Sequence, residues 1–173
     1  MAELAAVIVE TLAGYYEEIG GQAHRWVDPL TTEQIWARPF GFQSASAQAG
    51  KPDGNSVGHI LLHLTGNLNY YIGAQIAGTG YVRHRDLEFS DVQKKSKEQV
   101  LADFDRAIAM VAATIRDQSP EDWTKPFSGE REPFAKDRFT AVFRCAAHAY
   151  HHVGQLVYLS KELTRPAAQA TAH

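Results

Sequence analysis

Four long segments of the sequence carry apolar residues at three- and four-residue steps, which is the spacing of one face of an α-helix. No segment shows the strict alternation of apolar and polar residues that a half-buried strand requires. We therefore expect helices from about residue 3 to 26, from about 56 to 77, from 96 onwards and from about 136 to 162. Four long amphipathic helices predict an all-α fold, a four-helix bundle.

The expected helix ends carry residues that cap helices. Asn55 and Ser56 both suit the N-cap of the second helix. Ser96 and Gln99 have the spacing of a capping box at the start of the third helix, and Pro166 stops the fourth. A chain of 173 residues suits one domain, so we expect a bundle domain over residues 1–165 and a disordered tail over 166–173.

Composition and charge limit the partners and the location that we expect. Hydrophobic residues make up 45% of the sequence, and the formal net charge of −3 gives no electrostatic basis for binding nucleic acid or an anionic membrane. No apolar run approaches the roughly 20 residues that span a bilayer, and the N-terminus lacks the basic region of a signal peptide. The single cysteine, Cys145, excludes a disulfide within the chain, so we expect a cytoplasmic protein.

Three histidines lie within five positions near the end of the sequence, at His148, His151 and His152, although the chain has only eight. On a helix, His148 and His152 share a face at the spacing with which two imidazoles bind one metal ion. His148 and His151 also share a face, so spacing alone does not choose the pair. We interpret His24, His84 and His173 as ordinary polar surface residues.

A third ligand has two candidates in the second helix, His59 and His63, which are also four residues apart. On a helical wheel His63 lies roughly 120° from the centre of the apolar stripe and His59 roughly 160°. We therefore expect His63 in a groove beside the core and His59 facing solvent or a partner, with the choice of ligand left open. The apolar stripe expected on the fourth helix runs through Phe139, Ala146, Tyr150, Val153 and Val157.

The motifs around these histidines resemble those of a known family. Asn55-Ser56-Val57-Gly58-x4-His63-Leu64 and His148-x3-His152-x-Gly154-Gln155 look like the DinB-like (YfiT-like) metalloenzymes, and the resemblance covers roughly residues 3 to 163. It implies an up-down-down-up four-helix bundle with short extra helical turns in the loops, and a homodimer. It also implies a divalent metal held by His63, His148 and His152. His151 falls at a frequent non-ligand histidine, and His59 stands where an aromatic residue is usual.

The implied site has the chemistry of a metal-dependent enzyme. Three neutral imidazoles leave zinc or nickel an open position, as in catalytic sites. Characterised members of the family include transferases and isomerases that use low-molecular-weight thiols, so the resemblance implies activation of such a thiol towards a small-molecule substrate. A metal-water hydrolase and a non-catalytic, stress-associated metal-binding module are the alternatives.

Other residues have candidate roles around this site. Asn67 and Gln155 either orient the histidine rings or are helix-surface amides. Arg83 and Arg85 either contact an anionic substrate or belong to a solvated charge run with Asp86 and Glu88. We interpret Cys145 as a small core residue rather than a nucleophile.

Overall fold

The computed structural model describes residues 2–38, 55–90, 92, 94–127, 129 and 135–166. These residues are mostly helical and contain no β-strand. The helices are α1 (Ala2–Val27), α2 (Thr32–Trp36), α3 (Val57–Leu68), the π-helix η1 (Asn69–Ala74), α4 (Arg85–Glu88), α5 (Lys97–Arg116), the 3₁₀-helix η3 (Asp122–Thr124) and α6 (Arg138–Leu163). The all-α bundle expected from the sequence is confirmed.

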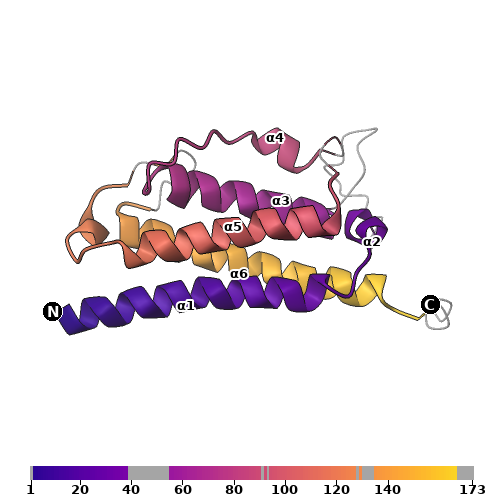
Figure 1. The fold of residues 1–173 in the computed structure, drawn as a ribbon, viewed down its shortest axis with the longest axis horizontal. Helices are drawn as coiled ribbons and strands as arrows, with labels where there is room; N and C mark the ends of the chain where they lie inside the picture. The colour runs from indigo at the N-terminus through magenta and orange to yellow at the C-terminus, as the bar shows by residue number, and fades with distance from the viewer. Residues whose placement is uncertain are drawn as a thin grey trace.

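The four long helices run up, down, down and up in chain order, with α1 and α6 in one direction and α3 and α5 in the other (Figure 1). α1 and α5 are antiparallel, because His24 near the end of α1 bonds to Asp105, while Arg116 at the end of α5 pairs with Glu17. The short helix α4 lies over α3 at the top of the view. This topology is the one that the family resemblance implies.

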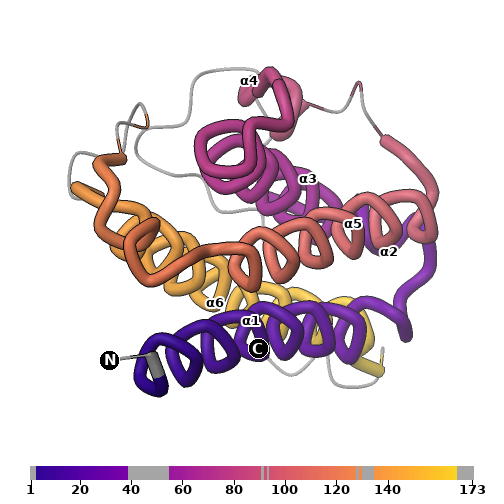
Figure 2. The backbone as a smooth tube through the Cα atoms, turned by 60° about the vertical axis from the view of Figure 1, so that its left-hand side comes forward, coloured from indigo at the N-terminus to yellow at the C-terminus, as the bar shows by residue number. Residues whose placement is uncertain are grey.

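α6 packs parallel to α1 and faces α3 on its other side. The buried hydroxyl of Tyr16 donates a hydrogen bond to the Val142 carbonyl at 2.8 Å, and the Lys161 ammonium lies 5.4 Å from the centre of the Trp26 ring. Figure 2 shows α3 on the side of the bundle away from α1. α6 therefore lies between these two helices and presents a separate face to each of them.

α3 is buried on nearly all sides, and this makes one expectation wrong. Every residue of α3 except Thr65 is buried. His59, expected to face solvent or a partner, is only 1% exposed: its ring lies edge-on to that of Trp36, and its side chain completes a capping box with Ser56. The helical wheel assumed a solvent-facing side, but α2 covers that side through Trp36.

α6 departs from its expected apolar stripe. Phe139 and Tyr150, expected in the core, are 39% and 42% exposed, and they stack at the surface on Phe143 and Tyr15 respectively. The buried face is made of smaller side chains: Ala141, Val142, Cys145, Ala146, Ala149, Val153, Leu156, Leu159 and Ser160. Small residues let α6 approach α1 and α3 closely, which displaces the large rings to its edges. Cys145 is buried, as expected.

The expected helix ends are confirmed at two points and corrected at another. Ser56 is the N-cap of α3, and Ser96 caps α5 through a capping box with Gln99. The second helix, expected to continue as an α-helix to residue 77, changes to the π-helix η1 after Leu68. The expected tail over 166–173 lies outside the described residues apart from Pro166.

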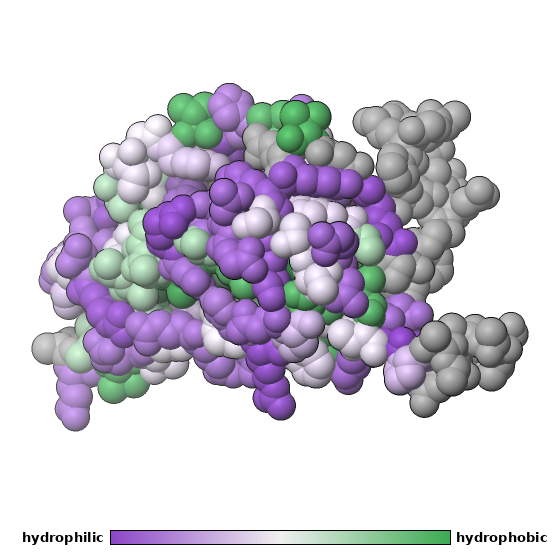
Figure 3. All heavy atoms as spheres, turned by 45° about the vertical axis from the view of Figure 1, so that its right-hand side comes forward, coloured by the Kyte–Doolittle hydropathy of each residue, from purple (hydrophilic) through white to green (hydrophobic). Residues whose placement is uncertain are grey.

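The face of the molecule in Figure 3 is mainly hydrophilic, with hydrophobic residues in small scattered groups. Among the described helices, none combines the length and apolar character needed to cross a bilayer. The buried apolar side chains of the described residues form one cluster, to which α1, α3, α5 and α6 all contribute. This core holds α3 and α6 side by side.

Candidate metal centre

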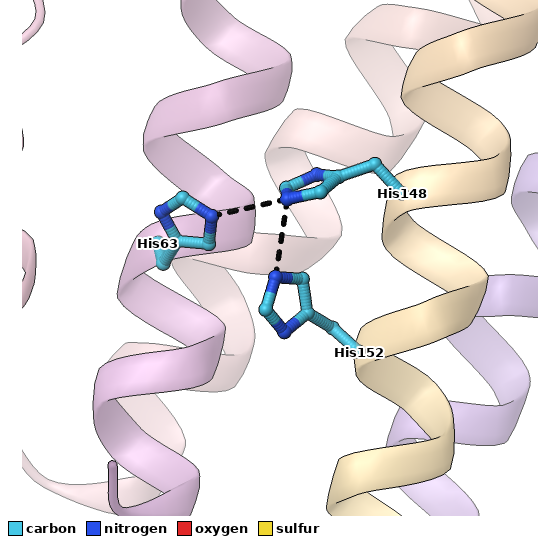
Figure 4. Close-up of side chains that lie close together, drawn as sticks. All are labelled: His63, His148 and His152. Atoms are coloured by element: carbon cyan, nitrogen blue, oxygen red, sulfur yellow. Dashed lines mark hydrogen bonds between the residues drawn. The ribbon is translucent and has the colours of Figure 1, made fainter. Parts of the chain in front are cut away.

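Three imidazoles converge between α3 and α6. Nε2 of His148 lies 3.3 Å from Nε2 of His63 and 3.1 Å from Nε2 of His152. Figure 4 shows His63 projecting from α3 and the other two from successive turns of α6, with the ring tips pointing toward one another. One ligand atom from each residue lies within 4.8 Å of those of the other two. The structure thus brings together the three histidines that the family resemblance selects.

The spacing of these nitrogen atoms matches the edge of a metal coordination tetrahedron. With Zn–N distances of about 2.0–2.1 Å, two ligands of a tetrahedral ion lie about 3.3 Å apart. The two measured Nε2–Nε2 distances, 3.3 and 3.1 Å, are close to this value. The group contains three potential ligands among the described residues, which leaves a fourth tetrahedral position for another molecule.

Hydrogen bonds fix the tautomer of two of the rings. Nδ1 of His63 lies 2.9 Å from Oε2 of Glu88, and because a carboxylate only accepts, Nδ1 carries the proton. Nδ1 of His152 lies 2.7 Å from Oε1 of Gln155 and donates to it in the same way. In both rings Nε2 therefore presents a lone pair to the centre of the site. A metal ion requires this state of its imidazole ligands.

Burial keeps the α6 histidines neutral. It is the main cause that lowers the pKa of His148 to about 3, and the nearby rings of His152 and His63 lower it further. Burial also lowers the pKa of His152 to about 4, although the hydrogen bond with Gln155 acts in the opposite direction. Nδ1 of His148 is buried and has no hydrogen-bond partner among the described residues. The two α6 rings thus offer neutral nitrogen donors at neutral pH without competition from protons.

Behind His63 lies a buried ion pair that the sequence does not reveal. Glu88 accepts from Arg83 Nε at 2.6 Å and from Arg83 Nη2 at 2.8 Å, in addition to the bond from His63. Burial opposes ionisation of Glu88, but the hydrogen bonds from Arg83 and His63 outweigh it and hold the pKa of this carboxyl below its ordinary range. The 3.2 Å approach of Arg83 Nη2 to His63 Nδ1 is a contact between two donors that share Oε2.

This ion pair corrects the interpretation of residues 83–88 as a solvated charge run. Glu88 is 6% exposed, and Arg83 turns inward to reach it. Arg85 and Asp86 do stay exposed, and the Arg85 guanidinium lies 5.1 Å from the centre of the Phe89 ring. Glu88 was missed because its two partners are five and 25 positions away. The apolar neighbour Phe89, whose ring packs against that of His63, is the local sign of its burial.

The remaining candidates divide between the site and its surroundings. Gln155 orients His152, and its amide nitrogen lies 3.4 Å from Nε2 of His151, which is exposed and is not one of the three converging histidines. Asn67 is buried, and its Oδ1 makes no hydrogen bond within the described part of the chain. His59 is not one of the three converging histidines, and its ring contacts Ser56, Trp36 and Arg38.

Two hollows flank the segment that carries Glu88. One has a volume of about 590 Å³ and is lined by Tyr70, Tyr71, Arg83, His84, Arg85, Asp86 and Leu87. The other has a volume of about 500 Å³, lies between this segment and the helices α3 and α5, and includes Gly66 and Glu88 in its lining. Both are within the range of small-molecule sites. The lining of the first includes Arg83, which pairs with the Glu88 that contacts His63, and neither lining includes one of the three histidines.

Comparison with known proteins assigns the chain to a family. A family model described as a protein of unknown function, DUF1572, matches residues 43–170. A comparison with curated proteins finds no match. The matched range includes α3 and α6, which supply all three converging histidines. Because the matched range spans well over half of the sequence, the chain belongs to DUF1572, a DinB-like family of unknown function.

Proposed function

We propose that the protein binds one divalent metal ion, zinc or nickel, through Nε2 of His63, His148 and His152. The observation that carries this proposal is the convergence of three nitrogen donors at Nε2–Nε2 distances of 3.1 and 3.3 Å. Two of these donors have their lone pairs directed inward by hydrogen bonds at Nδ1. Nε2 of His148 lies 3.3 and 3.1 Å from the other two, and a cation at the centre would draw the lone pairs of all three nitrogen atoms to one point.

We further propose that the site is catalytic and activates a low-molecular-weight thiol in a transferase or isomerase reaction. A divalent ion held by three neutral imidazoles supplies Lewis-acid chemistry at its remaining position, lowering the pKa of a thiol or a water bound there. The chain's own contribution is to fix the rings: Glu88 holds His63, and Gln155 holds His152. The hollow of about 590 Å³ beside Arg83 offers space for a small-molecule substrate.

Thiol activation is preferred over hydrolysis because of how Glu88 is used. A hydrolase of this kind needs a general base close to the attacking water. Glu88 is the carboxylate that lies nearest to His63 in the described contacts, but Arg83 and His63 already occupy both of its oxygens. A thiol needs no such base once its pKa is lowered. A metal-binding module without activity is the other alternative. Activity measurements separate it from the thiol-dependent enzyme and from the hydrolase.

Metal analysis of protein purified without a histidine tag tests the site. We expect about one zinc or nickel ion per chain, and an increase in melting temperature when the ion is added to chelator-treated protein. His148→Ala should abolish both effects, whereas the matched control His151→Ala, one helical position from His152 and exposed, should preserve them. Wild-type protein that neither contains nor binds a divalent ion overturns the proposal.

A pair of variants on α3 tests the choice of the third ligand. His63→Ala should lose metal affinity, and His59→Asn should keep it, because the native side chain at this position belongs to the capping box of α3 and not to the metal centre. The opposite result would show that the wrong histidine had been chosen.

Thiol binding is tested separately with cobalt-loaded protein, whose near-ultraviolet spectrum gains a sulfur charge-transfer band when a thiol such as N-acetylcysteine binds the metal. The homodimer implied by the resemblance stays a prediction for sedimentation velocity.

A further inference from the structure

Glu88 lies in a fully paired and nearly dry environment. The exposed fractions of the side chains are 7% for Glu88, 10% for Arg83 and 8% for His63. Oε1 accepts one hydrogen bond from Arg83, and Oε2 accepts one from Arg83 and one from His63. The bidentate ion pair fixes the plane of the carboxylate, so Oε2 can meet Nδ1 of His63 from only one direction. The arrangement holds one ring nitrogen in a defined orientation and tautomer.

A glycine on α3 creates the space for this carboxylate. A Cβ atom added to Gly66 would lie 2.1 Å from Oε1 and 2.8 Å from Cδ of Glu88. Contacts this short do not occur, so any other residue at this position would push the carboxylate away from α3. Gly66 lies three residues after His63 and hence on a neighbouring part of the same helix face. The sequence of α3 therefore provides both the ring and the recess for its partner.

The segment 83–89, which we call the strap, contacts α3 through this carboxylate. The two hollows of about 590 and 500 Å³ flank the strap, and both are lined by His84 and Leu87. Besides Glu88, the strap contacts His63 through the Phe89 ring, whose centre lies 5.0 Å from that of the imidazole. Both of these contacts are made to His63. The orientation of His63 and the position of the strap are thus linked.

We propose that Glu88 is a positioning residue, which holds His63 in the Nδ1–H tautomer and couples the order of the strap to the metal centre. This inference rests on the proposed metal site. A metal ion at Nε2 requires the proton at Nδ1, and that proton is the one donated to Glu88. Because coupling between two sites is reciprocal, a strap held by Glu88 strengthens metal binding, and bound metal holds the strap in place.

The first test measures the His63 tautomer by nitrogen NMR of the side chains in metal-free protein. In the wild type we expect the Nδ1–H form of His63. In Glu88→Gln, which keeps the shape of the side chain, we expect a mixture of tautomers, because one amide oxygen cannot accept all three hydrogen bonds. A merely structural role for Glu88 would leave the tautomer of His63 unchanged, and that result would overturn the proposal.

The second test measures zinc affinity and the hydrogen exchange of the strap. Glu88→Gln and Gly66→Ala should each weaken zinc binding by about 10- to 100-fold. Zinc should slow amide exchange over residues 83–89 in the wild type, and much less in both variants. The control is Gly14→Ala on α1, where an added Cβ meets no described atom within 4 Å, and which should match the wild type.

The outcomes separate this inference from the metal site itself. If the wild type binds zinc, and both Glu88→Gln and Gly66→Ala bind it equally well, the positioning role is wrong and the metal site stands. If the wild type binds no divalent ion, the proposed function fails, along with the coupling of the strap to metal. The tautomer measurement in metal-free protein then still decides whether Glu88 positions His63.

Discussion

The two helices that supply the histidines hold them by different means. His63 on α3 is buried, and its orientation depends on Glu88 and Arg83, which come from a distant part of the chain. His152 on α6 is half-buried, and its partner Gln155 comes from the next turn of the same helix and is exposed. Helical spacing alone therefore builds the α6 half of the site, whereas the α3 half depends on the tertiary fold.

The largest effect expected from this difference concerns stability. Glu88→Ala leaves the Arg83 guanidinium buried without its carboxylate, which should lower the free energy of unfolding by about 3–5 kcal/mol. Gln155→Ala removes an exposed amide and should cost less than about 1 kcal/mol. Urea denaturation of both variants measures the difference.

A double variant serves as the control for this prediction. Arg83→Met combined with Glu88→Ala removes both charges, so it should recover a large part of the stability that Glu88→Ala loses. Equal losses for the single and the double variant would mean that the buried charge is not the cause.

A pair of glycines compares the packing of the two helices directly. A Cβ atom on Gly58 of α3 would lie 2.5–2.7 Å from three atoms of the Trp36 ring, which is held in place by its hydrogen bond to the Lys95 carbonyl. Gly58→Ala should therefore lower stability by about 1–3 kcal/mol. Gly154 of α6 has open space around it, so Gly154→Ala should raise stability by about 0.5–1 kcal/mol through helix propensity. In thermal unfolding, the melting temperature should fall for Gly58→Ala and rise for Gly154→Ala. A change of the same sign in both variants would contradict the comparison.

The smallest expected effect concerns a histidine outside the site. His24 lies 3.1 Å from Asp28 and 2.9 Å from Asp105, and although burial opposes protonation, these two carboxylates raise its pKa. A histidine whose pKa is higher in the folded than in the unfolded protein stabilises the fold when it is protonated. This contribution is fully present at pH values below the unfolded pKa of about 6.5, and it is lost as the pH rises through the folded pKa.

His24→Gln tests this sign. The substitution should reduce the free energy of unfolding by a few tenths of a kcal/mol at pH 5.5 and by less at pH 9, since the pair is more than one-third exposed and screened by solvent. Urea denaturation at the two pH values measures the change, and a loss that grows with pH would refute the assignment. His24 thus differs from His148 and His152, whose pKa values are lowered.

The contrast between α3 and α6 also explains what could be predicted from the sequence. Helix caps are local signals: Ser96 was predicted correctly, and Ser56 was one of the two candidates for the start of its helix. Spacing on one helix indicated a histidine pair that includes His148, and the family motif selected His152 over His151 and His63 over His59. Glu88 could not be found in this way, because a charged residue five positions from Arg83 is indistinguishable from a solvated pair until the fold buries it. The burial of His59 likewise depends on Trp36, a residue from another helix.

The π-helix η1 has an evolutionary consequence. A π-helical turn contains about one residue more than an α-helical turn, and here it is marked by the bonds from Gln75 N to the Tyr70 carbonyl and from Ala77 N to the Ile72 carbonyl. Such a turn is the expected result of inserting one residue into an established helix, since it absorbs the extra residue without rotating His63 upstream. Relatives without the insertion should align with a one-residue gap near residues 69–74 and should continue as a regular α-helix there.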